Sequence, residues 1–326
     1  MTTVISHTTV DGHRAVVLED DRTRAVVLPG LGGRVWELHD LARGVQWVWH
    51  RPGVPLAVPA AGAEYDAVWA GGWEELFPND AAGLFESRQL PDHGEWWSLA
   101  WEVEAIDEGR AAVLRLGVDT TVRRCRCTKE FRLLADRAGI EVRYRIESRE
   151  DEPFHFLFKQ HLPLQLAPGL RLVAPGGTVV PVDPAFGSRV TTPGPHRWPF
   201  VRGADGGVAD LRVVHPASAR EQEFIYVSDL PAAWCGADDA ARGASLRMHW
   251  DHRQLPFLWF FVSYGGWRDV HTVVLEPCTN LPKDLAEAVR RGQAATLGPR
   301  ATFETQVRVV LSSHADAEAA GAGDAR

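Results

Sequence analysis

The chain has 326 residues, of which 45% are hydrophobic and 24% charged, a composition typical of globular proteins rather than of disordered chains. Its formal net charge of −8 provides no basic excess for binding nucleic acid. No apolar run approaches the ~20 residues of a membrane-spanning helix, and the N-terminal residues do not follow the pattern of a signal peptide. We therefore expect a cytoplasmic protein with neither a nucleic-acid partner nor a membrane partner.

Short apolar or alternating segments separated by turn residues recur along almost the whole chain, which is the pattern of β-strands. In chain order, the expected strands are residues 15–18, 24–27, 34–38, 97–105, 112–116, 125–133, 140–148, 155–166, 211–214, 223–227, 246–250, 258–262, 272–275 and 302–311. This spacing favours an all-β fold, one large antiparallel β-sandwich, over alternating strands and helices. We expect residues 1–312 to form a single domain, with the Pro- and Gly-rich residues 167–206 as a surface excursion.

One short helix is expected near residues 283–291. Leu285, Ala288 and Val289 share a face, Pro282 suits the first helical position and Gly292 suits the C-terminal end. The last residues, 313–326, are small and polar, which predicts a disordered tail.

The four cysteines are too few and too scattered to form a disulfide framework. Cys125 and Cys127 are two residues apart in an expected strand, so their side chains point to the same face and are poorly placed to bridge. We expect Cys125, Cys127, Cys235 and Cys278 to be reduced and partly buried.

Thirteen tryptophans are present, and several stand near candidate site residues. Trp97 follows His93 closely, and Trp259 precedes Glu276. An indole packs its flat face against the C–H side of a sugar and donates its N–H to a hydroxyl. Packing in the core is the alternative for each tryptophan, but together they favour a carbohydrate ligand.

Four polar residues occur where acid–base chemistry could take place. His93 lies in a loop before a run of tryptophans, where it is either a ligand-binding or a surface histidine. Lys159 and His161 share one face of an otherwise apolar strand, and a packed core histidine is the alternative for His161. Glu276 ends an apolar run, so it is either a paired structural residue or a base whose pKa burial raises.

Metal binding is the obvious rival in a chain with 13 histidines. His249, Asp251 and His252 come closest to a ligand set, but none of the familiar metal-binding spacings occurs. Nucleotide-binding and serine-hydrolase motifs are absent from the sequence as well. We therefore expect no metal and no cofactor.

Several segments resemble the galactose mutarotase-like superfamily, in its branch related to aldose 1-epimerases. They follow in the family's order: residues 32–35 (Gly-Gly-Arg-Val), 46–50, 71–79 (from Gly-Gly-Trp to Phe-Pro-Asn), 90–94 with Trp101 beyond, 160–163 (Gln-His-Leu-Pro), 275–279 (Leu-Glu-Pro-Cys-Thr) and 297–299. The resemblance covers about residues 10–312. Trp96 and Trp97 stand where the hexose-phosphate branch has an arginine, which argues against a phosphorylated sugar.

The resemblance implies the supersandwich form of the β-sandwich, a small-molecule carbohydrate as partner, and a monomer or homodimer. It also implies a cofactor-independent isomerase of the aldose 1-epimerase type, which interconverts the α and β anomers of a sugar by opening its ring. Glu276 would be the catalytic base and His161 the catalytic acid. The expected substrate-binding residues are His93, Lys159, Arg34, Trp73, Trp97 and Trp259.

Two other functions remain open from the sequence. The first is a carbohydrate-binding or sugar-sensing protein without catalysis on the same fold. The second is a glycosidase or lyase, which would need another acidic residue within ~5–10 Å of Glu276. The observation that separates catalysis from sugar binding alone is whether His161 and Glu276 face each other across one cleft.

Overall fold

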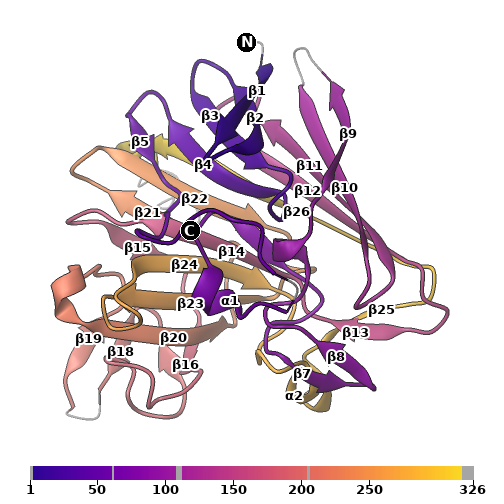
Figure 1. Cartoon of the computed structure of the whole chain (residues 1–326). Coiled ribbons are helices and arrows are strands. Elements are labelled where there is room, and N and C mark those ends of the chain that lie inside the picture. Colours follow the sequence, from indigo (N-terminus) through magenta and orange to yellow (C-terminus); the bar gives the residue numbers. More distant parts are fainter. Residues whose placement is uncertain (1–2, 61, 108–111, 204–205, 318–326) are drawn as a thin grey trace.

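The computed structural model describes residues 3–60, 62–107, 112–203 and 206–317 (Figure 1). Strands dominate it, and neighbouring strands in the large sheets pair antiparallel, which confirms the predicted all-β class. No helix among the described residues is long and apolar enough to cross a membrane.

Three sheets and two small strand pairs make up the fold. The five-stranded sheet, indigo in Figure 1, contains β1 (Val4–Val10), β2 (His13–Glu19), β3 (Thr23–Leu28), β4 (Arg34–Asp40) and β5 (Val45–Gln46). The eight-stranded sheet runs in the order β15 (Arg171–Val173), β21 (Trp234–Asp239), β22 (Ala244–Trp250), β26 (Thr302–Ser313), β12 (Ala138–Ser148), β11 (Cys125–Leu133), β10 (Val113–Thr120) and β9 (Glu102–Asp107). The nine-stranded sheet runs in the order β19 (Val208–Asp210), β18 (Phe200–Arg202), β17 (His196–Arg197), β16 (Thr178–Pro181), β20 (Glu221–Ser228), β23 (Phe257–Tyr264), β24 (His271–Cys278), β14 (Lys159–Gln165) and β6 (Glu74–Leu76). The pairs are β7 (Gly83–Phe85) with β8 (Arg88–Leu90), and β13 (Phe154–Phe156) with β25 (Ala295–Leu297).

The nine-stranded sheet is apolar on both faces over its central strands, and the two faces serve different purposes. On β23, Leu258, Phe260 and Val262 belong to the main core, which the eight-stranded sheet shares. The alternate residues, including Trp259 and Phe261, point to the opposite face and pack in a second cluster. This second face carries the candidate site.

The predicted helix is present as α2 (Leu285–Arg290). Its N-cap is Asp284, whose carboxylate accepts a hydrogen bond from the backbone N–H of Glu287. The prediction that Pro282 occupies the first helical position was therefore wrong. A second helix, α1 (Tyr65–Val68), was not predicted. Residues 314–317 form a helical turn rather than a disordered tail, and residues 318–326 lie outside the described part of the chain.

Some predicted strands differ from the observed ones. Residues 97–105 begin as the 3₁₀ turn Trp96–Ser98, and β9 starts only at Glu102. Trp96 and Trp97 are consecutive and both buried, which a strand with one wet face does not allow. Residues 211–214 form only an isolated bridge at Val213, and the segment 155–166 is interrupted between β13 and β14. Residues 167–206 supply β15 to β18 and so are not only a surface excursion. All four cysteines are free and buried, as expected.

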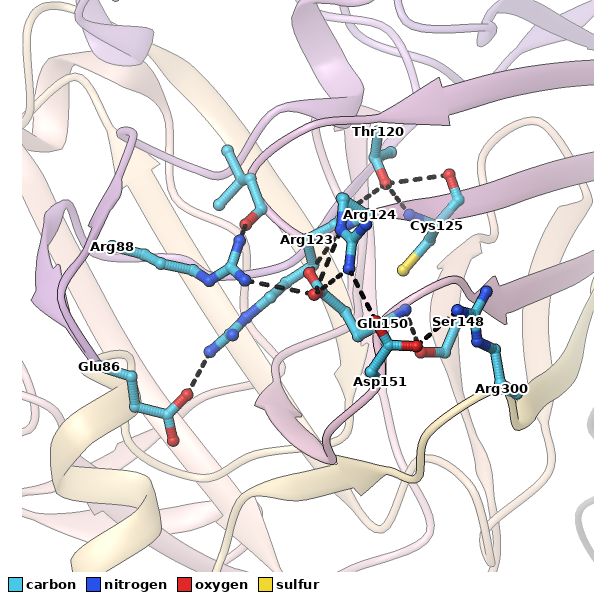
Figure 2. A network of polar contacts seen from close by, with 11 residues as sticks. Glu86, Arg88, Thr120, Arg123, Arg124, Cys125, Ser148, Glu150, Asp151 and Arg300 are labelled. Atoms are coloured by element: carbon cyan, nitrogen blue, oxygen red, sulfur yellow. Dashed lines mark hydrogen bonds and ion pairs between the residues drawn. The ribbon is translucent and has the colours of Figure 1, made fainter.

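A network of charged residues fastens the β7–β8 hairpin to the end of the eight-stranded sheet (Figure 2). Glu150 follows β12, and its carboxylate accepts hydrogen bonds from the backbone N–H of Arg124 at 2.9 Å and from the guanidinium of Arg88 at 3.2 Å. Arg88 also donates to the carbonyl of Val122. Glu150 is buried, and its carboxylate is the acceptor that connects Arg124 to Arg88.

We expect Glu150→Ala to lower the free energy of unfolding by about 1–3 kcal/mol, because it removes the charged acceptor of several hydrogen bonds, including that of the partly buried backbone N–H of Arg124. Urea denaturation measures this change. The matched control is Glu147→Ala, which removes an exposed glutamate paired with Arg145 and should cost less than about 1 kcal/mol. Equal effects of the two substitutions would contradict the role of this network.

Candidate functional site

A cavity of about 230 Å³ lies on the face of the nine-stranded sheet that points away from the main core. One part of its lining is polar and comprises Asp66, Asp80, His93, Lys159, His161, Asp183, Glu276 and Lys283. Another part is aromatic and comprises Tyr65, Trp69, Phe186, Phe224, Phe261 and Trp267. In Figure 1 this region is where α1 lies in front of β23 and β24.

A larger groove of about 700 Å³ lies on the eight-stranded sheet and is lined mainly by charged side chains. These side chains pair with one another, as Arg115 does with Glu130 and Arg145 with Glu304. Such pairs are typical of a solvated sheet face, and their charges are already satisfied. The smaller cavity is therefore the better candidate site.

Strand alternation explains how the polar groups reach the cavity. Lys159 and His161 are two residues apart on β14 and so point to the same face. Gln160, between them, points to the opposite face, where its amide oxygen accepts from the indole N–H of Trp73. Strand β24 pairs with β14 and places Glu276 beside Lys159.

The ammonium of Lys159 joins two carboxylates from distant parts of the chain. Its Nζ lies 2.5 Å from Oδ2 of Asp80 and 2.5 Å from Oε2 of Glu276. It also lies 4.4 Å from the ring centroid of Trp259, within range of a cation–π interaction. All three groups are almost completely buried, so the ionised form of each is stabilised by its oppositely charged neighbours and not by water.

Burial and pairing move the pKa values of these three groups in different directions. Burial disfavours the charged form of Lys159, but Asp80 and Glu276 outweigh this effect and raise its pKa. For Asp80, burial alone would raise the pKa of the carboxyl, but Lys159 and His93 together outweigh it and lower that pKa. For Glu276, burial dominates and raises the pKa, although Lys159 opposes the rise. Glu276 is therefore the more basic carboxylate of the two.

His93 reaches the cavity from the loop between β8 and the Trp96–Ser98 turn. Its backbone has φ = +58°, and the following Gly94 has φ = +70°. A Cβ at position 94 would lie 2.3 Å from the carbonyl oxygen of Phe77, so only glycine fits there. The backbone N–H of His93 donates to the carbonyl of Asp80 at 2.7 Å, which holds these two site residues together.

The imidazole of His93 is held by Asp92 and Tyr65. Its Nδ1 lies 2.8 Å from Oδ1 of Asp92, and its ring stacks on that of Tyr65 with centroids 4.0 Å apart. Oδ2 of Asp92 accepts from the backbone N–H of Tyr65, the first residue of α1. Burial disfavours the imidazolium, but Asp80 and Asp92 outweigh it and raise the pKa of His93.

His161 has the opposite electrostatics. Its Nδ1 lies 3.2 Å from the hydroxyl of Tyr65, and Trp69 contacts its ring edge-on. Burial, together with the positive charges of Lys159 and His93, lowers the pKa of His161 well below its ordinary value. The imidazole of His161 is therefore neutral near pH 7, whereas His93 favours the charged form.

No model of a known protein family matches the sequence, and no curated protein sequence matches it either. Solved structures do match. A protein from Klebsiella pneumoniae, described provisionally as an aldose 1-epimerase, superposes with a TM-score of 0.77 at 14% identity, over 96% of this chain and 83% of that one. A galactose mutarotase-like protein from Clostridium acetobutylicum superposes with a TM-score of 0.67 at 12% identity, over 96% and 99% of the two chains. A galactose mutarotase related enzyme from Lactobacillus acidophilus gives 0.66 at 11% identity, over 92% and 97%.

The chain has the galactose mutarotase-like fold. The superposed proteins share almost the full length of the sandwich, which agrees with the resemblance seen in the sequence. At such low identities the likeness establishes the fold alone, so the activity has to be argued from the site residues.

Within this fold, four of the residues expected at the site line the cavity together: His93, Lys159, His161 and Glu276. The other four, Arg34, Trp73, Trp97 and Trp259, are buried and do not line the cavity.

Each of these four side chains is held by a hydrogen bond or an ion pair to a neighbouring residue. The indole N–H of Trp97 donates to the carbonyls of Asp92 and Gly94, and that of Trp259 donates to the carbonyl of Asn280. Trp73 bonds to Gln160 on the core side, as described above. Arg34 pairs with Glu74 behind Tyr65.

The sequence interpretation did not select several cavity residues of the mutarotase-like fold. Asp80 directly follows the segment 71–79 that carried the resemblance, so its position was a usable signal. Trp69 and Trp267 stood near the candidate residues but were not selected. Tyr65 lies in a segment with no distinctive pattern, and only the structure shows its contacts with His93 and His161.

His249, Asp251 and His252, which come closest to a metal-ligand set in the sequence, do not line this cavity. His249 ends up on β22, and the carboxylate of Asp251 accepts from the backbone N–H of Arg253. Among the residues that the structure describes, no group of three His, Cys, Asp or Glu side chains is arranged to hold a metal ion.

Proposed function

We propose that this protein is a mutarotase-like isomerase that interconverts the anomers of a monosaccharide by acid–base ring opening. The observation that supports this proposal is the convergence of Glu276, His93 and His161 on one small cavity with aromatic walls. Their residues lie up to 183 positions apart in the sequence, and their pKa values are shifted in opposite directions. Groups of unlike pKa in one cavity are what proton transfer at two oxygens requires.

In the proposed reaction, Glu276 accepts the proton of the anomeric hydroxyl while an imidazolium donates a proton to the ring oxygen. The C1–O5 bond breaks and the anomeric carbon becomes a carbonyl. Rotation about C1–C2 presents the other carbonyl face, and the two protons return as the ring closes. Each proton transfer contributes about 10²–10⁴-fold to the rate.

The choice of acid follows from the electrostatics. The family resemblance implied this role for His161, but the lowered pKa of His161 favours the neutral imidazole. His93 has a raised pKa, and its Nδ1 is occupied by Asp92. We therefore propose that His93 donates to the ring oxygen and that His161 holds the sugar beside it.

The cavity favours one uncharged sugar ring. Its volume of about 230 Å³ is below the ~300–1,000 Å³ of most small-molecule sites. Lys159 already has two carboxylate partners, and the described lining residues include no arginine. A phosphate or sulfonate would therefore find few unpaired cations beyond the exposed Lys283.

The proposal predicts that catalytic amounts of the protein accelerate equilibration of a freshly dissolved pure anomer. Anomeric proton NMR follows the reaction for a panel of aldohexoses, pentoses and 6-deoxyhexoses, with a hexose 6-phosphate as the charged comparison. We expect acceleration for at least one uncharged sugar, equal rates with and without EDTA, and no acceleration for the phosphate. Saturable binding of a sugar without acceleration would instead identify a carbohydrate-binding protein.

The glycosidase alternative has one observation in its favour. Oδ2 of Asp80 and Oε2 of Glu276 are each 2.5 Å from the same nitrogen, so they cannot be more than 5 Å apart. That is close to the ~5–5.5 Å carboxylate separation of retaining glycosidases. However, the ammonium of Lys159 occupies the space between the two oxygens, where a glycosidic bond would have to lie. Release of nitrophenol from nitrophenyl glycosides would support hydrolysis over anomerisation.

A further inference from the structure

Behind His161, a row of buried polar side chains leads from the cavity to the five-stranded sheet. Nδ1 of His161 lies 3.2 Å from the hydroxyl of Tyr65. That hydroxyl donates to Oε1 of Glu74 in a short hydrogen bond. Oε2 of Glu74 is 2.8 Å from the guanidinium of Arg34. Each of these side chains is at most about 6% exposed.

Arg34 is itself fixed in place. Its three nitrogens donate to the carbonyl oxygens of Leu31, Gly71 and Trp97 at 2.9–3.2 Å. Burial raises the pKa of Glu74, while Arg34 opposes that rise. A guanidinium stays charged in proteins, so the buried pair keeps Glu74 as the carboxylate.

The proton count along this row determines the tautomer of His161. Burial and the neighbouring Glu74 raise the pKa of Tyr65 well above its ordinary value, so its hydroxyl keeps one proton. The carboxylate of Glu74 can only accept, so that proton points to Glu74. The hydroxyl oxygen of Tyr65 is then left to accept, and Nδ1 of His161 must be the donor.

We propose that Arg34, Glu74 and Tyr65 form a positioning chain that holds His161 as the Nδ1–H tautomer and leaves its Nε2 bare at the cavity. Among the described residues, Nε2 of His161 has no hydrogen-bond partner, and the ring lines the cavity. A bare Nε2 accepts a hydrogen bond from a sugar hydroxyl and cannot donate one. The assignment of the tautomer does not depend on the proposed function. The expected effect of the tautomer on anomerisation does rest on the proposed function.

The charged groups that face His161 agree with this state. Lys159 lies on its own strand, His93 on the neighbouring loop and Arg34 on β4, and all three disfavour a second proton on the ring. Glu74 stands opposite His161 in the pairing of β14 with β6, and its carboxylate connects to the imidazole through the hydroxyl of Tyr65.

The chain offers a matched control on the other face of β6. The hydroxyl of Tyr144 donates to Oε1 of Glu75 at 2.6 Å, and Glu75 pairs with the buried ammonium of Lys129. Tyr144 is as buried as Tyr65. Tyr144→Phe therefore removes an equivalent buried hydrogen bond without touching the cavity.

The experiment is ¹⁵N NMR of the histidine ring nitrogens in wild type, Tyr65→Phe and Tyr144→Phe, with the His161 signals assigned by their loss in His161→Asn. We expect wild-type His161 to be protonated at Nδ1 only, from about pH 6 to pH 8. Tyr65→Phe should move part or all of that proton to Nε2, because the acceptor for Nδ1–H is gone. Tyr144→Phe should keep the wild-type spectrum.

Anomerisation kinetics on the same proteins provide the second readout. We expect Tyr65→Phe to lower kcat about five- to tenfold, the worth of one hydrogen bond, and Tyr144→Phe to leave kcat per folded molecule unchanged. An Nε2–H tautomer in wild type, or equal spectra for the two phenylalanine variants, would overturn the proposal. The expected tautomers in a protein without anomerase activity would refute the proposed function and leave the positioning chain standing.

Discussion

Replacing Glu276 by glutamine should lower the rate of catalysed anomerisation by about 10²–10⁴-fold while leaving the protein folded. Glutamine has nearly the same size but cannot accept the anomeric proton. Lys159 keeps Asp80 as its carboxylate partner, so the buried ammonium is not left unpaired. Sugar affinity should fall much less than the rate, because the aromatic lining and both histidines remain.

The measurements are anomeric NMR for the rate, calorimetric titration for sugar affinity and thermal denaturation for stability. Glu95→Gln is a suitable control, because Glu95 is also buried but bonds to the backbone of Thr121 and Val122 away from the cavity. Wild-type rates in a well-folded Glu276→Gln protein would end the mechanism proposed above. A lost rate that follows only the folded fraction would assign Glu276 a structural role.

Replacing Lys159 by methionine should have a large effect on both stability and activity. Two buried carboxylates, those of Asp80 and Glu276, would lose the ammonium that lies 2.5 Å from each. Breaking a buried ion pair from one side typically costs about 3–5 kcal/mol of unfolding free energy. One carboxyl would have to take up a proton, and Glu276 would be the one, because burial already raises its pKa. Anomerisation at pH 7 should then fall by more than about 100-fold, since a protonated base is inactive.

The pH dependence of this loss has a definite sign. In wild type, the raised pKa of Lys159 means that its stabilising effect is complete below the ordinary lysine pKa of about 10.5 and is lost only above the folded-state value. In the variant, the further raised pKa of Glu276 destabilises the fold above the ordinary glutamate value of about 4.3. The stability deficit should therefore already be present near pH 4, where wild-type Lys159 is charged and paired with Asp80, and should grow further as the pH rises through the folded-state pKa of Glu276.

Lys129→Met provides the control for this prediction. Lys129 is equally buried and pairs with Glu75, on the opposite face of β6. The Lys129→Met protein should also lose stability, because Glu75 would be left without its cation, but it should keep its anomerisation rate per folded molecule. Urea denaturation at several pH values, combined with the NMR assay, separates the two variants. Equal losses of activity in both would show that Lys159 contributes only to folding.

The sequence was most informative in strands whose residues alternate between a buried face and a second, different face. Residues 140–148 were predicted as a strand, and in β12 Tyr144 is buried between the exposed Arg143 and Arg145, as strand alternation requires. The same logic put Lys159 and His161 on one face of β14, where both line the cavity. These predictions succeeded because side chains on a strand alternate regardless of the sheet in which the strand lies.

The parts of the site that the sequence did not predict depend on contacts between distant segments. Tyr65 lies in a four-residue helix whose first N–H is accepted by Asp92, 27 positions later. Trp73 and Trp97 were assigned to sugar binding, yet both are buried behind the cavity. A tryptophan has the same local signature whether its indole faces a ligand or the core. Only the register of β6 and the path of the loops decide between the two.

The adjacent glutamates of β6 also restrict how this edge strand can pair. Glu74 forms an ion pair with Arg34 on one face of the strand, and Glu75 forms an ion pair with Lys129 on the other face. A slip of one residue would place Glu75 and Leu76, or Trp73 and Glu74, in these two positions. Either slip leaves one buried cation without its carboxylate, at a cost of about 3–5 kcal/mol. Two identical neighbours thus specify a single register at the sheet edge, because the cations they neutralise lie on opposite sides.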